Sequence, residues 1–378
     1  MSIRVLQVGK FFPPDSGGIE TTTKDLLDVN EEAYHSDVLC FSSYRKTRKE
    51  LLGKCQIIRC STIFTVASMP FSLSYCYYFK KMRNRYDIIH LHHPNPLGVI
   101  CALIFKYKGK LIIHWHSDIL NKGFFYRVFS PLERALLKRA DKIVATSPVY
   151  ITESPVLKDF RFKCSFIPSA YNESSLLVDA AEAAAIKEHY KNKKIVFSLG
   201  RHVGYKGFHF LIKAAQYLPD DVVILIGGTG PLNNFHRDLI KELGLEKKVL
   251  LPGRIPGESL GNFYAACDVF CLPSCHKAEA FGLVLIEAMR FSKAIVATNI
   301  PGSGVSWVNE HGVTGLNVEN ESPRALAEGL TYLLSNDRVR LEYGENAYKR
   351  YMQYFTDVQM RKSFYKLYRE TSEEKKQL

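Results

Sequence analysis

The sequence predicts an α/β protein of two doubly wound domains, each built around a mostly parallel sheet. Short apolar runs alternate with segments of helical periodicity along the whole chain, and this alternation is typical of βαβ units. A length of 378 residues is long for a single hydrophobic core. The apolar share of 46% and the charged share of 24% are those of a globular protein, and they argue against disordered and collagen-like chains.

The expected strands form two series, one in each half of the chain. In the first half we expect strands over residues 3–8, 36–41, 57–59, 88–92, 111–114 and 142–146. In the second half we expect them over residues 195–199, 222–226, 249–251, 269–272 and 294–297. A turn-like segment at 168–172 and an Ala/Glu-rich helix over 179–191 separate the two series. We therefore expect a first domain over 1–170, a second over 171–355 and a charged amphipathic helix over 356–378.

The formal net charge of +13 is concentrated in the first half of the chain. Residues 1–170 hold 25 Lys/Arg and 14 Asp/Glu, a net charge of +11, whereas residues 171–378 hold 26 and 24, a net charge of +2. A basic half predicts contact with an anionic surface. Nucleic acid would be such a surface, but no base-stacking or groove-reading motif accompanies the charge, so we expect no nucleic-acid partner.

An aromatic segment in the first half directly precedes a basic cluster. Five aromatic residues between 71 and 79 are followed by Lys80, Lys81, Arg83 and Arg85. Ser, Thr and Pro interrupt the apolar stretch 63–79, which is shorter than the ~20 apolar residues of a membrane span. Two interpretations stay open: a segment that lies on an anionic bilayer, or a helix packed on its own domain with a solvated basic end. The basic first half favours the bilayer.

Cysteine, histidine and acidic residues predict a reduced protein without a metal. The nine cysteines are odd in number and show no pairing pattern, and the N-terminus lacks the plan of a signal peptide. We expect a cytoplasmic protein, peripheral on the inner face of the cytoplasmic membrane. Structural zinc sites usually use tighter ligand pairs than the Cys-x3-Cys-x3-Cys at 267–275, and no Asp-x-Asp pair could hold Mg²⁺. His90, His92, His93 and His114 lie at or just after strand ends, where we expect satisfied or cleft-lining histidines rather than metal ligands.

Paired glycines follow the first expected strand. Gly17 and Gly18 precede a predicted helix, where backbone N–H groups and the helix dipole favour an anion. Any βα turn can contain Gly-Gly, so this pair alone indicates little. A nicotinamide-binding fingerprint needs three spaced glycines directly after a strand, and neither this loop nor Gly228-Thr229-Gly230 has them. A dehydrogenase is therefore disfavoured.

Two cations and two glutamates are the residues of the second half that most clearly indicate a ligand site. Arg201 and Lys206 follow an expected strand beside glycines and suit a diphosphate, since Arg offers a bidentate fork and Lys a mobile point charge. On these two residues alone, a pair of solvated surface cations is the alternative. Glu279 and Glu287 lie on either side of Gly282, one in a loop and one about a turn inside a helix, so both can point to one crevice. Carboxylates suit the hydroxyls of a sugar or ribose.

Together these residues resemble the retaining nucleotide-sugar glycosyltransferases of family GT4. In the second half the resemblance is carried by Arg201 with Lys206, the glycine loop 227–230 and the Glu-x7-Glu of Glu279 and Glu287. In the first half it is carried by Gly17-Gly18 and by the His-Ser-Asp at 116–118. The stretches 69–73, 116–119 and 279–291 look most like bacterial mannosyltransferases that build O-antigen polysaccharide.

The resemblance implies a GT-B fold: two Rossmann-like domains facing a cleft, with the last helix crossing back to the first domain. It implies that Arg201 and Lys206 hold the donor diphosphate, that Glu279 binds donor-sugar hydroxyls and that Glu287 binds the ribose. It implies that His116 touches the donor sugar. The remaining donor contacts that it implies are Gly17 and Gly18 over the phosphates, Gly228 of the glycine loop, Arg254 and Ile255 by the base, and the backbone of Phe281, Gly282 and Leu283 beside the sugar. The segment 167–172 departs from the family, which more often has Asn-Gly after the proline.

The implied reaction is transfer of a hexose from a nucleotide diphosphate sugar to a hydroxyl, with the anomeric configuration retained. Mannose from GDP-mannose is the first expectation, and a polyprenyl-diphosphate-linked glycan of bacterial surface polysaccharide is the expected acceptor. We expect no cofactor or metal. The alternatives are a UDP-sugar-dependent transferase of the same fold, a soluble enzyme that uses a sugar-phosphate acceptor, and a binding subunit without turnover. The joint presence of the two cations and the two glutamates argues against the binding subunit.

Overall fold

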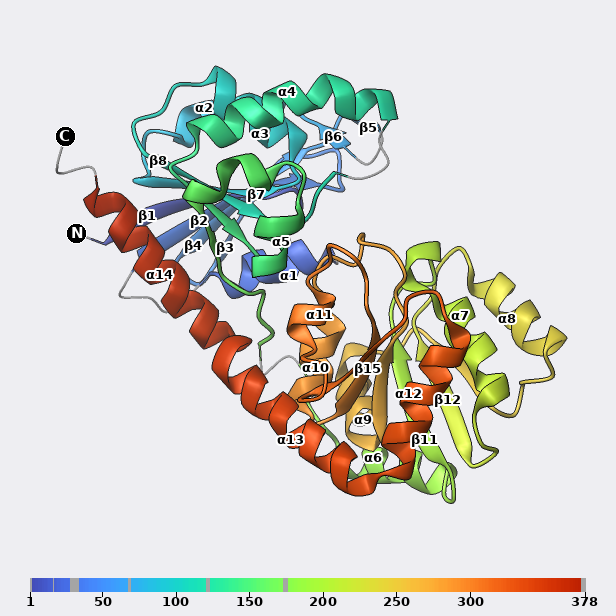
Figure 1. Cartoon of the computed structure of the whole chain (residues 1–378). Coiled ribbons are helices and arrows are strands. Elements are labelled where there is room, and N and C mark those ends of the chain that lie inside the picture. The colour runs from blue at the N-terminus through green and yellow to red at the C-terminus, as the bar shows by residue number, and fades with distance from the viewer. Residues whose placement is uncertain are drawn as a thin grey trace. The chain divides into compact units, whose positions relative to one another are not determined.

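The computed structural model describes residues 2–15, 17–27, 34–66, 69–119, 123–172 and 176–374. The chain divides into two compact units. The first unit is Met1–Ala170 together with Asp357–Leu378, and the second unit is Tyr171–Thr356. Each unit contains one large, mainly parallel sheet, which confirms the predicted α/β class (Figure 1).

The first unit contains an eight-stranded sheet in the order β10-β9-β8-β7-β1-β2-β4-β3. All neighbours pair in parallel except β3 with β4. The strands are β1 (Ile3–Val8), β2 (Tyr34–Ser42), β3 (Arg48–Leu52), β4 (Cys55–Ser61), β7 (Ile88–His93), β8 (Lys110–Trp115), β9 (Lys142–Ala145) and β10 (Cys164–Phe166). Two further strands, β5 (Phe64–Val66) and β6 (Met69–Phe71), form a separate antiparallel pair. The helices are α1 (Gly18–Asp25), α2 (Leu73–Met82), α3 (Pro96–Ile104), α4 (Gly123–Arg139), α5 (Pro148–Glu153) and α14 (Asp357–Glu373), with a 3-10 segment at Leu157–Lys163.

The second unit contains a six-stranded parallel sheet in the order β13-β12-β11-β14-β15-β16. The strands are β11 (Lys194–Leu199), β12 (Val222–Gly227), β13 (Val249–Gly253), β14 (Val269–Leu272), β15 (Ala294–Thr298) and β16 (Gly315–Val318). The helices are α6 (Ala180–His189), α7 (Phe208–Ala214), α8 (Asn233–Glu242), α9 (Gly257–Ala266), α10 (Leu283–Arg290), α11 (Val305–Val308), α12 (Pro323–Ser335) and α13 (Asp337–Tyr354). Alternate residues of β11 enter different cores, Val196 on one face and Ile195 with Phe197 on the other.

Every strand expected from the sequence is present, with ends that differ by at most two residues. The strands that the sequence did not indicate are short or lie at an edge. β3 is exposed and largely charged, so it lacks the apolar alternation by which a strand is recognised. β10 and β16 are only three and four residues long. Strands this short or this polar form by pairing with a neighbouring strand, so their own residues carry little of the pattern.

The last helix, α14, packs on the sheet of the first unit. Met360, Phe364 and Tyr368 join the cluster that contains Val5 of β1 and Ile88 of β7. α14 ends at Glu373, and residues 375–378 of the helix expected over 356–378 lie outside the described residues. This packing explains why a helix at the end of the chain belongs with the first 170 residues.

The aromatic segment before the basic cluster forms α2, which is anchored in the first unit. Tyr75 and Phe79 are fully buried, whereas Tyr77 is 57% exposed. Lys80 and Lys81 are exposed at the last turn of the helix. The segment is therefore a helix packed on its own domain with an exposed basic end, and its adsorption to a bilayer stays a prediction. Within the described residues, no helix is both long enough and apolar enough to cross a membrane.

Candidate functional site

The candidate donor site lies where three loops leave the second sheet, at the carboxyl ends of β11, β12 and β14. In this sheet β11 lies between β12 and β14, so the order of the strands reverses at β11. In open parallel sheets such a reversal leaves a crevice at the carboxyl ends of the strands, and ligands bind there. The cations and glutamates that the sequence singled out follow β11 and β14.

Two glycines allow these loops to approach one another closely. Gly228, after β12, has a φ of +114°, and a Cβ atom there would lie 1.9 Å from the carbonyl oxygen of Gly200. Gly207 has a φ of +64°, and its Cβ would lie 2.0 Å from the carbonyl oxygen of Pro273. Both positions combine a left-handed backbone with a contact that excludes any side chain. The loop after β11 is thereby joined to the loops after β12 and β14.

Lys206 and Glu279 form a buried ion pair across two of these loops. The Nζ of Lys206 lies 2.6 Å from Oε2 of Glu279, and each side chain is only 10% exposed. The same Oε2 accepts a hydrogen bond of 2.8 Å from the hydroxyl of Ser274. The hydroxyl of Ser303 donates to the main-chain carbonyl of Glu279. The second carboxylate oxygen of Glu279, Oε1, has no hydrogen-bond partner among the described residues.

The ion pair keeps Lys206 charged in spite of its burial. Loss of hydration alone would lower the pKa of Lys206. The nearby carboxylate of Glu279, with smaller contributions from Tyr205 and Glu287, more than offsets this effect and raises the pKa. Lys206 is thus not one of a pair of solvated surface cations, because its ammonium group is buried against the Glu279 carboxylate.

Glu287 lies on the buried side of α10, with its carboxylate close to the ion pair. Its Oε2 accepts a hydrogen bond of 2.6 Å from the hydroxyl of Tyr264. Burial raises the pKa of Glu287 to about 7, against the opposing effects of Tyr264 and Lys206. Gly282 precedes the helix with a φ of +78°. Glu287 therefore resembles Glu279 in having one carboxylate oxygen held and the other without a partner among the described residues.

The other donor contacts implied for the second unit are spread around these groups. Arg201 and Arg254 are exposed, and the Arg201 guanidinium makes no hydrogen bond or ion pair with the described residues. Ile255 packs over Gly227, where a Cβ atom would lie 2.6 Å from its Cδ1. The side chain of Phe281 is buried in the core, so only its backbone could serve the site, and Leu283 is the first residue of α10.

The paired glycines of the first unit lie at the start of α1, beside an acidic side chain. Gly17 has an extended backbone and Gly18 is the first helical residue. A Cβ atom on Gly17 would lie 2.1 Å from Oε2 of Glu20, so the Glu20 carboxyl group folds over this turn. Burial raises the pKa of Glu20. The helix start that we expected to face a phosphate is thus covered by a carboxyl group in this structure.

His116 lies directly after β8, in a cluster of buried histidines. Its Nε2 is 3.0 Å from Nδ1 of His92, and its ring stacks on that of His114 with centroids 3.9 Å apart. Burial lowers the pKa of His116 well below its usual value, and neighbouring histidines add to this effect. Burial therefore favours the neutral form of His116. Asp118, two residues later, accepts hydrogen bonds from Trp115 and Ser154 at 3.1 and 2.7 Å.

Sequence reasoning missed the residues that hold these groups in place. Ser274, Ser303 and Tyr264 support the two glutamates, and Gln7 supports the histidines. A lone Ser, Tyr or Gln in a single sequence gives no signal, because its partner is decided by the fold. The position of Ser274, two residues after the end of a predicted buried strand, is the one hint that was available.

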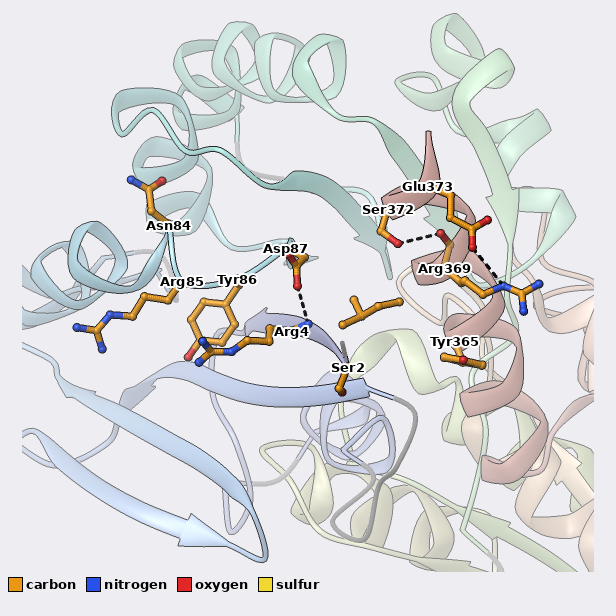
Figure 2. Close-up of a pocket in the computed structure, with 11 residues that line it drawn as sticks. Ser2, Arg4, Asn84, Arg85, Tyr86, Asp87, Tyr365, Arg369, Ser372 and Glu373 are labelled. Carbon is orange, nitrogen blue, oxygen red and sulfur yellow. Dashed lines mark hydrogen bonds and ion pairs between the residues drawn. The ribbon is translucent and has the colours of Figure 1, made fainter. Parts of the chain in front are cut away.

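A cavity of about 730 Å³ lies elsewhere in the first unit. Figure 2 shows it between the start of β1, the segment before β7 and the end of α14. Asp87 accepts a hydrogen bond of 3.0 Å from the backbone N–H of Arg4, and Arg369 of α14 contributes a further guanidinium. This cavity is at the amino end of β1, whereas ligands in this class of fold bind at the carboxyl ends of the strands. We do not assign it to the reaction.

The chain matches two families of known proteins. Residues 16–152 match Glycosyltransferase Family 4, and residues 179–350 match Glycosyl transferases group 1. The chain is 31% identical over 370 residues to the O-antigen chain mannosyltransferase C of Escherichia coli, covering 97% of this chain and 98% of the relative. It is 29% identical over 359 residues to a D-rhamnosyltransferase of Pseudomonas aeruginosa, covering 94% and 92%.

Solved structures agree with this assignment at the level of the fold. The sucrose-phosphate synthase of Thermosynechococcus elongatus superposes with a TM-score of 0.80 at 21% identity, covering 97% of this chain and 98% of that one. Anabaena HepE in complex with UDP superposes with a TM-score of 0.76 at 19% identity, covering 97% and 99%. This chain belongs to the group 1, family 4 glycosyltransferases and is a glycosyltransferase of GT-B fold.

Proposed function

We propose that this glycosyltransferase moves a hexose from a nucleotide diphosphate sugar to a lipid-linked glycan, with retention of the anomeric configuration. The observation that carries the proposal is the buried Lys206–Glu279 pair at the strand-order reversal of the second sheet. A fixed, charged ammonium group in a largely desolvated site suits a leaving diphosphate. The relative named as an O-antigen mannosyltransferase supports mannose from GDP-mannose as the first donor to test, and the relative named as a D-rhamnosyltransferase makes rhamnose the second.

The leaving diphosphate is held by two cations of different character. Lys206 supplies a charge that Glu279 keeps in position before the donor arrives, so little reorganisation is needed as the bond breaks. Arg201 is exposed, and its guanidinium can form a bidentate contact with phosphate oxygens. Because the chain has no Asp-x-Asp pair, these side chains take the role that a carboxylate-held metal would otherwise have.

The two glutamates bind hydroxyl groups. The Oε1 atom of Glu279 is available to a hydroxyl of the donor sugar, and that of Glu287 to a ribose hydroxyl. Since the Glu279 carboxylate is held by Lys206 and Ser274, we assign it to recognition rather than to nucleophilic attack. The proton of the acceptor hydroxyl then leaves late, to the departing phosphate. Gly17, Gly18 and His116 are proposed donor contacts of the first unit.

The proposed acceptor is a glycan on a polyprenyl diphosphate, reached at the inner face of the cytoplasmic membrane. A relative from Campylobacter jejuni, 27% identical over 347 residues, is named for a glycosylated diphospho-undecaprenol acceptor. On this chain Leu73, Tyr77, Lys80 and Lys81 of α2 are exposed, as is Arg85 just beyond it. Cations beside aromatic and aliphatic side chains suit reversible adsorption to anionic lipid. The protein would therefore be peripheral.

A donor panel tests the proposed function. Thermal shift and turnover would be measured with GDP-mannose, GDP-rhamnose, UDP-glucose, UDP-galactose and UDP-GlcNAc, using an undecaprenyl diphosphate-linked glycan as acceptor. We expect stabilisation and turnover with GDP-mannose, and an α-linked product. A response to UDP-sugars alone would show that the donor nucleotide is UDP and not GDP, and it would not contradict the proposed site residues. A product of inverted configuration would contradict the retaining mechanism.

A further inference from the structure

A chain of hydrogen bonds crosses one face of the first sheet and ends at His116. The Gln7 side chain on β1 donates from Nε2 to the Tyr368 hydroxyl of α14, at 3.2 Å. Its Oε1 is 2.9 Å from Nε2 of His92 on β7. The Nδ1 atom of His92 is 3.0 Å from Nε2 of His116 after β8. Gln7 and His92 are completely or almost completely buried, so these contacts form in the absence of competing water.

The same face offers a histidine cluster that could be mistaken for a metal site. Ring nitrogens of His90, His92 and His114 lie within 4.8 Å of one another. The rings stack, however: those of His90 and His92 have centroids 4.6 Å apart at an angle of 15°, and those of His90 and His114 are 5.3 Å apart at 25°. Stacked rings direct their nitrogen lone pairs along parallel planes, not toward one point. Both nitrogens of His92 are also taken by Gln7 and His116. We therefore interpret these histidines as part of a hydrogen-bonded chain and not as a metal site.

The direction of each hydrogen bond follows from the Gln7 amide. A carbonyl oxygen can only accept, so the contact between Gln7 Oε1 and His92 requires the proton of His92 to be on Nε2. A neutral His92 then has a lone pair on Nδ1, which accepts from His116. The proton of His116 is consequently on Nε2, and its Nδ1 has the lone pair. Burial supports the neutral forms, since it lowers the pKa of His92 to about 3.

We propose that Gln7 and His92 are positioning residues that hold His116 in its Nε2–H tautomer, so that His116 Nδ1 accepts a hydrogen bond from a hydroxyl of the donor sugar. Nδ1 of His116 has no hydrogen-bond partner among the described residues and is not sealed from solvent. The opposite tautomer would present an N–H group and could not accept. This inference rests on the proposed contact between His116 and the donor, but the tautomer can be measured without any donor.

The test is a two-bond nitrogen–proton correlation spectrum of the protein labelled with ¹⁵N-histidine, with His116 assigned from a His116→Gln variant. We expect His116 of the wild type to show a protonated Nε2 and an unprotonated Nδ1 at pH 7. In His92→Phe, which removes the acceptor, we expect a mixture of both tautomers. Gln7→Leu frees the His92 proton and should give the same mixture, so one variant remains if the other fails to fold. His114→Phe is the matched control, because His114 stacks on His116 without hydrogen-bonding to it.

Calorimetry with GDP-mannose and with GDP supplies the functional arm. A mixture of tautomers lowers only the fraction of His116 that can accept, so His92→Phe should weaken GDP-mannose binding about twofold. His116→Gln, which removes the imidazole acceptor, should weaken it about tenfold, and both variants should leave GDP binding unchanged. A protonated Nδ1 in the wild type, or an unchanged His116 spectrum in both His92→Phe and Gln7→Leu, would overturn the inference. If the spectra are as expected but His116→Gln binds GDP-mannose normally, the tautomer assignment is supported and the proposed donor contact of His116 fails instead.

Discussion

At the scale of single residues, the proposed donor site contains charges that are buried before any substrate is present. Lys206 and Glu279 neutralise one another in a nearly water-free setting, where breaking a pair leaves an uncompensated charge. Arg201 is proposed for the same site but is exposed, with its guanidinium free of hydrogen bonds and ion pairs to the described residues. The two cations therefore differ in what they contribute to stability, although both are proposed to serve the leaving group.

Substitution of either cation should reduce turnover strongly. We expect Lys206→Ala and Arg201→Ala each to lower turnover at least about a hundredfold, the scale for losing a preorganised charge contact to a leaving group. Lys206→Ala should also lower the melting temperature, since Glu279 is left buried and unpaired, whereas Arg201→Ala should not. Lys213→Ala, which removes an exposed charge on α7, is the control. Turnover like that of the wild type in a folded Lys206 or Arg201 variant would contradict the assignment.

The stability of the protein should depend on pH through Glu287. Because burial raises its pKa from 4.5 to about 7, the folded state keeps a proton that the unfolded state has already lost between these values. The free energy of unfolding contributed by this group therefore falls as pH rises from about 4.5 to 7. Glu287→Gln should flatten this fall, as measured by urea unfolding at pH 5 and pH 7.5. An equally steep fall in the variant would show that Glu287 is not responsible. Asp25, whose pKa is also raised to about 7, is expected to account for the remainder.

At the scale of secondary structure elements, α2 combines structural and surface roles on its two faces. Its buried face packs Tyr75 and Phe79 in the first unit, and its last turn presents Lys80 and Lys81. Arg83, in contrast, donates to the carbonyl groups of Lys106 and Lys80 and so is part of the structure around the helix end. A test of membrane adsorption should therefore leave Arg83 intact.

Removing the exposed cations at the end of α2 should weaken membrane binding. We expect a Lys80, Lys81, Arg85 triple Ala variant to co-sediment less with phosphatidylglycerol vesicles than the wild type. Each cation near an anionic leaflet contributes roughly 1 kcal/mol, and salt screens the effect. A Lys187, Lys241, Lys247 triple Ala variant removes the same charge from the second unit and is the matched control. Equal loss of binding in both variants would indicate that net charge, and not this surface, causes adsorption.

At the scale of the whole molecule, charge is divided between the two units according to the proposed ligands. The excess of cations lies in the first 170 residues, while the second half is nearly neutral. In the second half, the charged groups discussed above, Lys206, Glu279 and Glu287, are buried. Binding to an extended anionic membrane surface requires many dispersed cations, whereas binding of one diphosphate requires a few that are well placed. This distribution of charge is the one we expect if the first unit meets the membrane and the second unit binds the donor, as proposed.

Full activity is expected in excess EDTA. The proposed site neutralises the diphosphate with Arg201 and Lys206, and the potential metal ligands that cluster among the described residues are histidines of the first unit. Turnover would be compared with and without EDTA, and again after adding Mg²⁺ or Mn²⁺. Loss of turnover in EDTA that either ion restores would show that a metal takes part in the reaction.

Most of the fold could be predicted from the sequence because the buried strands of a parallel sheet are continuous apolar runs, which can be recognised locally. Runs such as Val269–Leu272 are apolar throughout, as strands covered on both faces must be. β3 could not be predicted, since its exposed, charged residues have no pattern of their own. For the site, Lys206 and Glu279 were recognised as candidates, but their pairing across 73 positions of sequence was not.

The sequence by itself determined which residue types are present and which loops carry them: Arg201 and Lys206 after one strand, and Glu279 and Glu287 around another turn. That information is local, because a few neighbouring residues determine where a strand ends and where a glycine-rich turn forms. Only the tertiary structure decided that Lys206 is held by Glu279, that Glu287 is buried against Tyr264, and that Gln7, His92 and His116 form one chain. These contacts join residues from different strands, and the free energy of each depends on burial that no local stretch of sequence contains.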